Sequence, residues 1–245
     1  MIRAASWVAL GTIMMAALAV QARAEPRAVI ELFTSQGCSS CPAADRLVGE
    51  LANDPSLVIM SLAIDYWDYL GWKDTLAIPR HSVRQRAYAR NRGDRQVYTP
   101  QVVINGSVHA LGSDKTAIEK AITESRRHPG TLSLPVTVSV NGDQLAVSVP
   151  AAKNDRGHGE VWLCALAKAV PVAVGRGENS GRTVTYHNVT RRWVKLGEWT
   201  GEARTWTAKI SDLKAEGVDA AAVIVQGGSA DNPGPIFGAA MAAIR

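Results

Sequence analysis

Two cysteines separated by two serines, in the segment CSSCP, constrain this chain more than any other feature of its sequence. An apolar run typical of a buried β-strand, residues 28–34, precedes the segment, and a run with helical spacing of apolar residues, 42–52, follows it. The sequence therefore predicts a strand, a polar turn and a helix, with Cys38 just before the helix and Cys41 in its first turn. Such a pair can be a redox centre, a pair of ligands to a metal ion, or a structural disulfide.

A position at a helix N-terminus gives the two cysteines different expected roles. Unpaired backbone N–H groups and the helix dipole stabilise an anion there, which favours the thiolate of Cys38. A thiolate is the attacking species in disulfide exchange, so Cys38, expected to be exposed, is the predicted nucleophile. Cys41, expected to be shielded, is predicted to resolve the mixed disulfide. The pattern favours a thiol–disulfide oxidoreductase that needs no cofactor.

Two other interpretations of the cysteine pair stay open. Two thiolates suit Cu(I), which is a soft ion, so a non-enzymatic copper carrier is the realistic metal version. Zinc normally takes four protein ligands or three plus water, and no metal-ligating residue is assigned. The pair can also be a passive disulfide in an interaction module. Cys164 alternates with apolar residues and is expected to be a buried, inert thiol, with a regulatory partner for Cys38 as the alternative.

The first 24 residues are predicted to be a secretory signal peptide. Arg3 precedes an apolar run, and Ala22-Arg23-Ala24 fits the small-x-small pattern of a processing site, so cleavage is expected after Ala24. The apolar run is about 17 residues long, at the lower limit for spanning a bilayer, which leaves an uncleaved anchor as the alternative. A cleaved chain is expected to be periplasmic or secreted, where disulfides persist, and to meet the membrane only transiently.

The charge balance narrows the class of partner. The formal net charge is +5, and it falls further once Arg3 and Arg23 leave with the leader. This charge is too small to indicate a nucleic acid as a partner. The expected partner is a protein or a small molecule that carries a thiol or a disulfide.

The rest of the chain is predicted to have two halves. Residues 25–130 alternate strand and helix patterns in the order β-α-β-α-β-β-α, whereas residues 131–245 hold short strand-like runs separated by turns. The second pattern is typical of a β-sandwich. We therefore expect an α/β domain over 25–130, followed by a mostly β, sandwich-like domain over 131–245.

A proline directly before an apolar strand adds to the pattern of the first half. In the segment VYTPQVVIN, Pro100 precedes the predicted strand 101–105. Together with the element order and the CSSC segment, this resembles the thioredoxin superfamily, which implies an α/β thioredoxin-like fold for 25–130. The resemblance also implies that Pro100 is a cis proline packed against the cysteine pair, where it guides the substrate. It further implies that the backbone of Thr99 binds an extended substrate.

A narrower resemblance covers nearly all of the chain after the leader. Four segments carry it: IELFTSQGCSSCP, DYWDYLGWKD, VYTPQVVING and GRGENSGRT. They are similar to a bacterial secreted family known as domain of unknown function 1223. This resemblance implies the fold but no reaction.

The chain departs from the thioredoxin pattern around its cysteines. Gly37 stands where the family usually has an aromatic residue, and Ser39 and Ser40 supply neither a proline nor a histidine. Without a cation between the cysteines, the thiolate loses one source of stabilisation, so a reducing or intermediate potential is predicted. Many thioredoxins also place a buried carboxylate on the preceding strand. Glu31 is only a weak candidate for it, because strand alternation turns Glu31 away from Leu32, which holds that register.

An aromatic segment, residues 65–74, is a candidate for shaping access to the pair. It holds four aromatic residues and three aspartates. Trp67 and Trp72 are predicted to form a substrate-binding wall beside Cys38. The alternative is that these rings pack against the second half of the chain, since large aromatic side chains mostly bury area.

Two further segments carry charged residues. The glycine-rich residues 174–182 are expected to form a hairpin loop, which can lie over the cysteine pair so that Arg176 or Glu178 tunes the thiolate. The arginine-rich residues 80–95 are expected to be a solvated helix face.

Overall fold

Strands dominate the structure of this protein. The computed structural model describes residues 25–152 and 157–244, and 43% of these residues are strand against 20% helix. The predicted signal peptide, 1–24, lies outside the described residues. None of the helices within those residues has the length and apolar character needed to cross a membrane.

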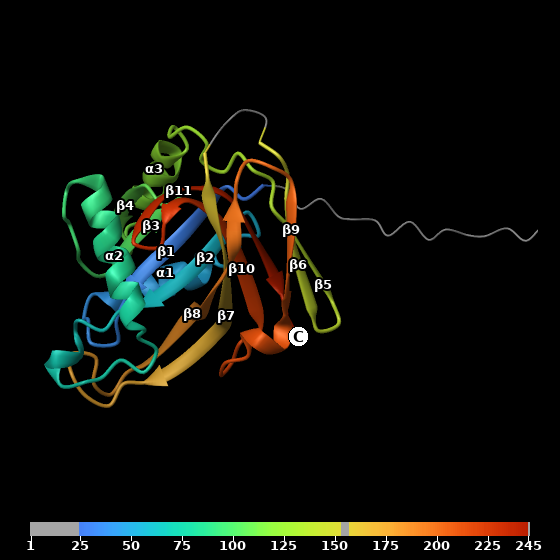
Figure 1. Ribbon diagram of the computed structural model, residues 1–245. Helices are drawn as coiled ribbons and strands as arrows, with labels where there is room; N and C mark the ends of the chain where they lie inside the picture. The colour runs from blue at the N-terminus through green and yellow to red at the C-terminus, as the bar shows by residue number, and fades with distance from the viewer. Residues whose placement is uncertain (1–24, 153–156, 245) are drawn as a thin grey trace, which may run out of the picture.

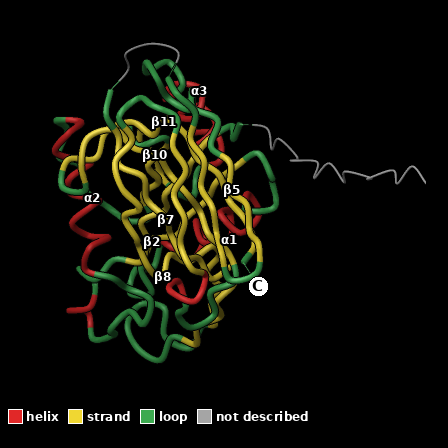
Figure 2. Tube along the Cα trace, turned by 45° about the vertical axis from the view of Figure 1, so that its right-hand side comes forward, coloured by secondary structure: helices red, strands yellow, loops and turns green. Residues whose placement is uncertain are grey.

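In the part of the chain that the structure describes, eleven strands form two sheets (Figure 1). The large sheet contains β1 (Ala28–Thr34), β2 (Leu57–Ala63), β3 (Gln101–Ile104), β4 (Val108–Leu111), β7 (Gly159–Ala173), β8 (Thr183–Trp199), β10 (Ala220–Ser229) and β11 (Asn232–Ala243). The small sheet contains β5 (Thr137–Asn141), β6 (Gln144–Val149) and β9 (Arg204–Lys209). The helices are α1 (Cys41–Leu51), α2 (Pro79–Arg92) and α3 (Lys115–Ser125), with short 3-10 turns η1 (Asp68–Leu70) and η2 (Ile210–Leu213). Figure 2 shows the strands side by side through the middle of the molecule.

The expected fold, an α/β thioredoxin-like domain followed by a mostly β, sandwich-like domain, is wrong. One mixed sheet in the order β11-β10-β7-β8-β2-β1-β3-β4 runs through both halves of the chain. The junction is a parallel pairing of β2 with β8 at Ser61 and Val189, supported by the Ser61 hydroxyl, which donates to the His187 carbonyl at 2.6 Å. An unpaired edge at β2 would expose its backbone polar groups, and β8 covers that edge.

Helix α2 also joins the two halves. Arg80, Arg86 and Arg90 are exposed, as expected for a solvated face, whereas Arg84 points into the interior. Arg84 is buried; its Nε donates to Glu31 Oε1 on β1 at 2.7 Å, and its Nη2 donates to Gln226 Oε1 on β10 at 2.8 Å. Arg80 lies over the ring of Trp162 on β7, 4.7 Å from its centroid. A buried charge needs partners, and those of Arg84 come from both halves of the large sheet.

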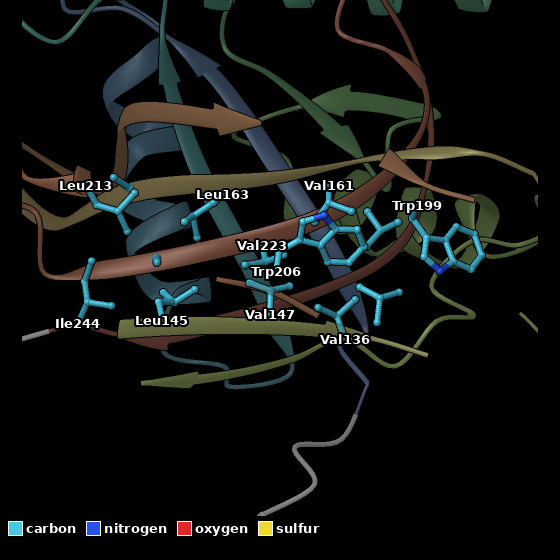
Figure 3. Close-up of a cluster of buried hydrophobic side chains, with 14 of the residues drawn as sticks. Val136, Leu145, Val147, Val161, Leu163, Trp199, Trp206, Leu213, Val223 and Ile244 are labelled. Carbon is cyan, nitrogen blue, oxygen red and sulfur yellow. The ribbon is translucent and has the colours of Figure 1, made fainter. Parts of the chain in front are cut away.

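The small sheet covers one face of β7 and β10 and closes a core there (Figure 3). Leu145 and Val147 of β6 face Leu163 of β7 and Val223 of β10, and all four are buried. A second core lies between α1, α3 and the strands β1 and β3. This second core fixes α1 against β1, and so positions the cysteine segment that joins them.

Candidate active site

The cysteine pair occupies the turn between β1 and α1. Cys38 and Cys41 form a disulfide, and helix α1 begins at Cys41 with Pro42 in its first turn. The backbone N–H of Cys38 donates to the Ser35 carbonyl, and that of Cys41 donates to the Cys38 carbonyl, both at 3.2 Å. These bonds curl the turn so that both sulfur atoms lie at the N-terminal end of the helix.

Both cysteines are buried, Cys38 at 3% exposure and Cys41 at 0%. The expectation of a shielded Cys41 is confirmed, whereas the expectation of an exposed Cys38 is wrong for this disulfide-bonded state. Ser39 and Ser40 between them are exposed. Solvent therefore reaches the two serines of this segment, whereas the two cysteines are covered.

The reason for the burial is the loop 174–182 between β7 and β8, which lies over the turn. Asn179 is buried, and its Nδ2 donates to the carbonyls of Gln36 at 2.9 Å and Cys38 at 2.8 Å. Glu178 Oε2 accepts the backbone N–H of Ser39 at 3.0 Å. The glycine-rich segment is thus a hairpin loop that covers the cysteines. The carboxylate of its Glu178 accepts the Ser39 N–H, two residues before the helix begins at Cys41. Arg176 is exposed.

Thr99 and Pro100 lie beside the cysteine pair. The peptide bond between them is cis, and Pro100 is buried. Ser40 links the two segments, because its Oγ donates to the Thr99 carbonyl at 3.5 Å and lies 3.4 Å from Cys38 Sγ. A Cβ placed on Gly112 would come within 3.2 Å of the Cβ atoms of both Pro100 and Ala44, which shows how closely the proline approaches α1.

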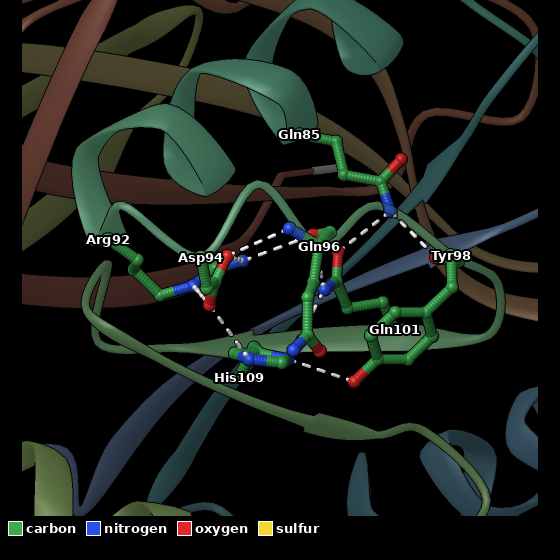
Figure 4. A network of polar contacts seen from close by, with 7 residues as sticks. All are labelled: Gln85, Arg92, Asp94, Gln96, Tyr98, Gln101 and His109. Atoms are coloured by element: carbon green, nitrogen blue, oxygen red, sulfur yellow. Dashed lines mark hydrogen bonds and ion pairs between the residues drawn. The ribbon is translucent and has the colours of Figure 1, made fainter.

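A polar network supports the segment that carries Thr99 and Pro100 (Figure 4). Gln85 of α2 donates from Nε2 to the Tyr98 carbonyl and to Gln101 Oε1, each at 2.8 Å. The Tyr98 hydroxyl lies 2.9 Å from His109 Nδ1, and His109 Nε2 lies 3.2 Å from Asp94. The residues on either side of the cis bond are therefore tied to α2 and β4.

Trp67 contacts Thr99 and the cysteine turn, and Trp72 lies against the covering loop. The Trp67 indole N–H donates to Thr99 Oγ1 at 2.7 Å. A Cβ on Gly37 would lie 3.2 Å from the Trp67 Cβ and a Cβ on Gly175 would lie 3.0 Å from the Trp72 ring. The aromatic segment and the loop 174–182 are neighbours in Figure 1. The structure thus places Trp67 against the turn, whereas Trp72 lies between the turn and the loop 174–182 of the second half.

Gln36, in the turn before Cys38, is held from three sides. Trp72 Nε1 donates to its side-chain oxygen at 2.8 Å, and Asp74 Oδ2 accepts its backbone N–H at 2.7 Å. Asn179 binds its carbonyl, as above. Asp74 is buried, and this burial raises the pKa of its carboxyl. The turn is therefore fixed to both halves of the molecule.

Asp45 is a functional candidate that was not singled out from the sequence. It lies four residues after Cys41 on α1, a spacing that puts two side chains on the same helix face. The residue is 1% exposed. Thr34 Oγ1 donates to its Oδ1 at 2.9 Å, and within the described residues Oδ2 has no hydrogen-bond partner. Burial raises the pKa of Asp45 to about 8. The sequence feature that could have identified Asp45 is a carboxyl group four residues after the second cysteine of the pair.

Glu31, the weak candidate from the sequence, does not lie on this side of the strand. It is paired with Arg84 on the face of β1 that meets α2, whereas Leu32 packs in the core under α1. Cys164 is buried in β7, and burial raises the pKa of its thiol. In residues 25–152 and 157–244, no cluster of three or more His, Cys, Asp or Glu side chains is placed to hold a metal ion.

Comparisons with known proteins identify relatives but no reaction. A family described as "Protein of unknown function (DUF1223)" matches residues 29–226. The crystal structure of protein AGR_C_4864 from Agrobacterium tumefaciens is 31% identical, covering 90% of this chain and 95% of that one, with a TM-score of 0.79. HBP35 of Porphyromonas gingivalis is similar in fold alone, at 12% identity and a TM-score of 0.60 over 90% of this chain and 76% of that one. No curated protein matches the chain.

Proposed function

This chain belongs to the DUF1223 family of proteins of unknown function, and we propose from its site that it is an exported thiol–disulfide oxidoreductase. The observation that carries the proposal is the Cys38–Cys41 disulfide at the start of α1, beside the backbone of Thr99 and Pro100. A disulfide formed by neighbouring cysteines is the oxidised half of a two-electron couple. The export rests on the leader pattern of residues 1–24.

The reaction runs through a mixed disulfide. In the reduced protein the Cys38 thiolate attacks one sulfur of a substrate disulfide, whose S–S bond breaks, and the released sulfur leaves as a thiolate that takes up a proton. The Cys41 thiol loses its proton and its sulfur attacks Cys38. The second substrate thiol is then released and protonated, and the Cys38–Cys41 disulfide forms. Two electrons pass from the pair to the substrate, and the reverse sequence oxidises a dithiol.

The proton on Cys41 needs an acceptor inside the protein, because Cys41 is fully buried. Asp45 lies one helical turn away, with one carboxylate oxygen that no described residue bonds. Burial raises the pKa of Asp45 to about 8, so its carboxylate is a stronger base than that of an ordinary aspartate and a better acceptor for a thiol proton. We assign the uptake of this proton to the ionised fraction of Asp45, which is the minor form at pH 7 and grows as the pH rises toward the pKa of about 8.

The covering loop sets how easily Cys38 ionises. Helix-terminal N–H groups favour a thiolate, but the carboxylate of Glu178 already accepts the Ser39 N–H. A negative charge at this place disfavours a second one nearby. This contact supports the prediction of a reducing or intermediate potential, because a less stabilised thiolate makes the dithiol the stronger reductant.

The test is to trap the mixed disulfide in a Cys41→Ser variant. This variant lacks the resolving thiol, so incubation of the reduced protein with hydroxyethyl disulfide should leave one adduct, found on Cys38 by peptide mass spectrometry. Wild-type protein under the same conditions should pass through this adduct to the intramolecular disulfide.

The matched control is the double variant Cys38→Ser, Cys41→Ser, which retains only Cys164 and should form no adduct while folded. A Cys41→Ser protein that forms no adduct, or forms it only on Cys164, would contradict the proposal. That outcome would leave the disulfide a passive element of the fold.

A further inference from the structure

An open cavity of about 590 Å³ adjoins the cysteine pair. It lies between α1 and the first residues of β8, and Pro42, which follows Cys41 directly, forms one wall. Its polar lining consists of Arg46, Arg182, two threonines and His187, and it contains no acidic residue. An opening lined by guanidinium, hydroxyl and imidazole groups presents hydrogen-bond donors and positive charge, which is the chemistry that binds an anion.

The two guanidinium groups are available to a ligand. Arg46 and Arg182 are both exposed, and among the described residues neither forms an ion pair with a carboxylate. Asp45 is next to Arg46 in sequence, but its raised pKa of about 8 keeps it mostly protonated at pH 7. The positive charge in the cavity is therefore not neutralised from within the protein.

The cavity is connected to the backbone of the cysteine turn through two hydrogen bonds. Arg182 Nη1 lies 3.4 Å from Asn179 Oδ1, and Asn179 donates to the Cys38 carbonyl at 2.8 Å. Arg46 lies one helical turn after Pro42 on α1. The cavity therefore meets the cysteine turn at two places, at Pro42 next to Cys41 and through Arg182 and Asn179 at the Cys38 carbonyl.

We propose that this cavity binds a carboxylate of the thiol or disulfide substrate, so that the site selects acidic substrates over neutral and basic ones. The inference rests on the proposed exchange reaction. Arginine forks match the geometry of a carboxylate and bind it through two parallel hydrogen bonds. Positive charge beside a site also raises the rate at which anionic partners arrive.

The experiment uses the Cys41→Ser protein and three small disulfides that differ in charge: dithiodipropionate, hydroxyethyl disulfide and cystamine. The rate of adduct formation at Cys38 is followed by intact-protein mass spectrometry. The measured quantity is the ratio of the rate with dithiodipropionate to that with hydroxyethyl disulfide, which cancels any change in the thiolate fraction of Cys38. Cystamine reports the effect of the opposite charge.

The additional substitution Arg46→Gln should lower this ratio about fivefold, the order expected for one nearby charge in water, and Arg182→Gln should do the same. The cystamine ratio should rise in both. Arg46→Gln keeps the contact between Arg182 and the covering loop, so its effect does not depend on loop position. Added salt should lower the ratio in the parent protein.

The matched control is Arg127→Gln, which removes the same charge from an exposed residue just after α3, at the other end of β1. This variant should keep the parent ratio. Equal ratios in all four proteins would overturn the carboxylate site while leaving exchange at Cys38 intact. An absence of any adduct with all three disulfides would instead overturn the proposed function itself.

Discussion

Replacing Asp45 by asparagine should stabilise the oxidised protein at pH 7 by about 1 to 3 kcal/mol, because it removes a proton uptake that folding now requires. The Asp45 carboxyl has a pKa of 3.8 in solvent and about 8 in the folded protein, where burial is the largest cause of the shift. Between these values the folded chain holds a proton that the unfolded chain releases. The contribution of the Asp45 carboxyl to the free energy of unfolding is therefore fully present below pH 3.8 and is lost as the pH rises toward 8.

The size of the effect follows from the two pKa values. Each pH unit in this window costs about 1.4 kcal/mol, so keeping Asp45 protonated at pH 7 costs about 4 kcal/mol of stability. An asparagine needs no proton. Its amide N–H₂ takes the place of the unpartnered Oδ2, and a buried unsatisfied donor costs about 1 to 3 kcal/mol. The difference between the two costs is the expected gain.

Urea denaturation between pH 5 and pH 8 measures this directly. The free energy of unfolding of Asp45→Asn minus that of the wild type should increase with pH, by about 1.4 kcal/mol per unit until it levels near pH 8. Glu50→Gln removes an exposed carboxylate from the same helix and serves as the matched control for the loss of one negative charge. A constant difference for Asp45→Asn would show that the folded protein does not hold that proton.

Replacing Asn179 by alanine should destabilise the protein by about 2 to 3 kcal/mol, which is the usual cost of leaving a buried polar group without its partner. The Asn179 amide donates to the carbonyls of Gln36 and Cys38. The Cys38 carbonyl keeps the N–H of Cys41, so the larger share of the cost comes from Gln36. The substitution also releases the covering loop from the cysteine turn.

Urea denaturation of the oxidised protein measures this loss of stability, with Ser180→Ala as the matched control. Ser180 lies next to Asn179, is exposed, and bonds only within the loop, to the Gly175 carbonyl at 3.1 Å. Its removal should change the free energy of unfolding by less than about 0.5 kcal/mol. Equal unfolding midpoints for Asn179→Ala and wild type would mean that the loop does not hold the turn.

The local parts of this site follow from the sequence because they depend on short-range patterns. The apolar run 28–34 and the helix predicted to open at the CSSCP segment are confirmed as β1 and α1. Residues 174–182 form the expected hairpin loop, and the cis peptide bond before Pro100 agrees with the resemblance to thioredoxins. Each of these features is encoded within about ten residues.

Features that join distant segments were not predicted, and this explains the incorrect fold class. A nearly continuous apolar run indicates that β2 is a strand buried on both faces, but it does not indicate that β8 pairs with it. Likewise, the helical pattern of α2 does not show that Arg84 meets Glu31 and Gln226 in the interior. The two halves therefore looked separable, although one sheet and the buried hydrogen bond between Arg84 and Gln226 unite them.

The burial of Cys38 has the same origin. The helix position of Cys38 is a local property, whereas its cover, Asn179, comes from a loop 141 residues later in the chain. The sequence suggested that this loop can lie over the pair. The hydrogen bonds in the structure show that the loop binds the turn on both sides of Gly37. They also show that Glu178, and not Arg176, contacts the turn.

Cys38 is proposed as the attacking thiolate and Cys41 as its buried partner. The most direct measurement is the rate of alkylation of each cysteine in the reduced, folded protein by iodoacetamide across a range of pH, read out by peptide mass spectrometry. Cys38 should react first, with a midpoint below the value of an ordinary cysteine, about 8.5, while Cys41 and Cys164 stay protected. Alkylation of Cys41 as fast as Cys38, or a Cys38 midpoint at or above that ordinary value, would contradict the account.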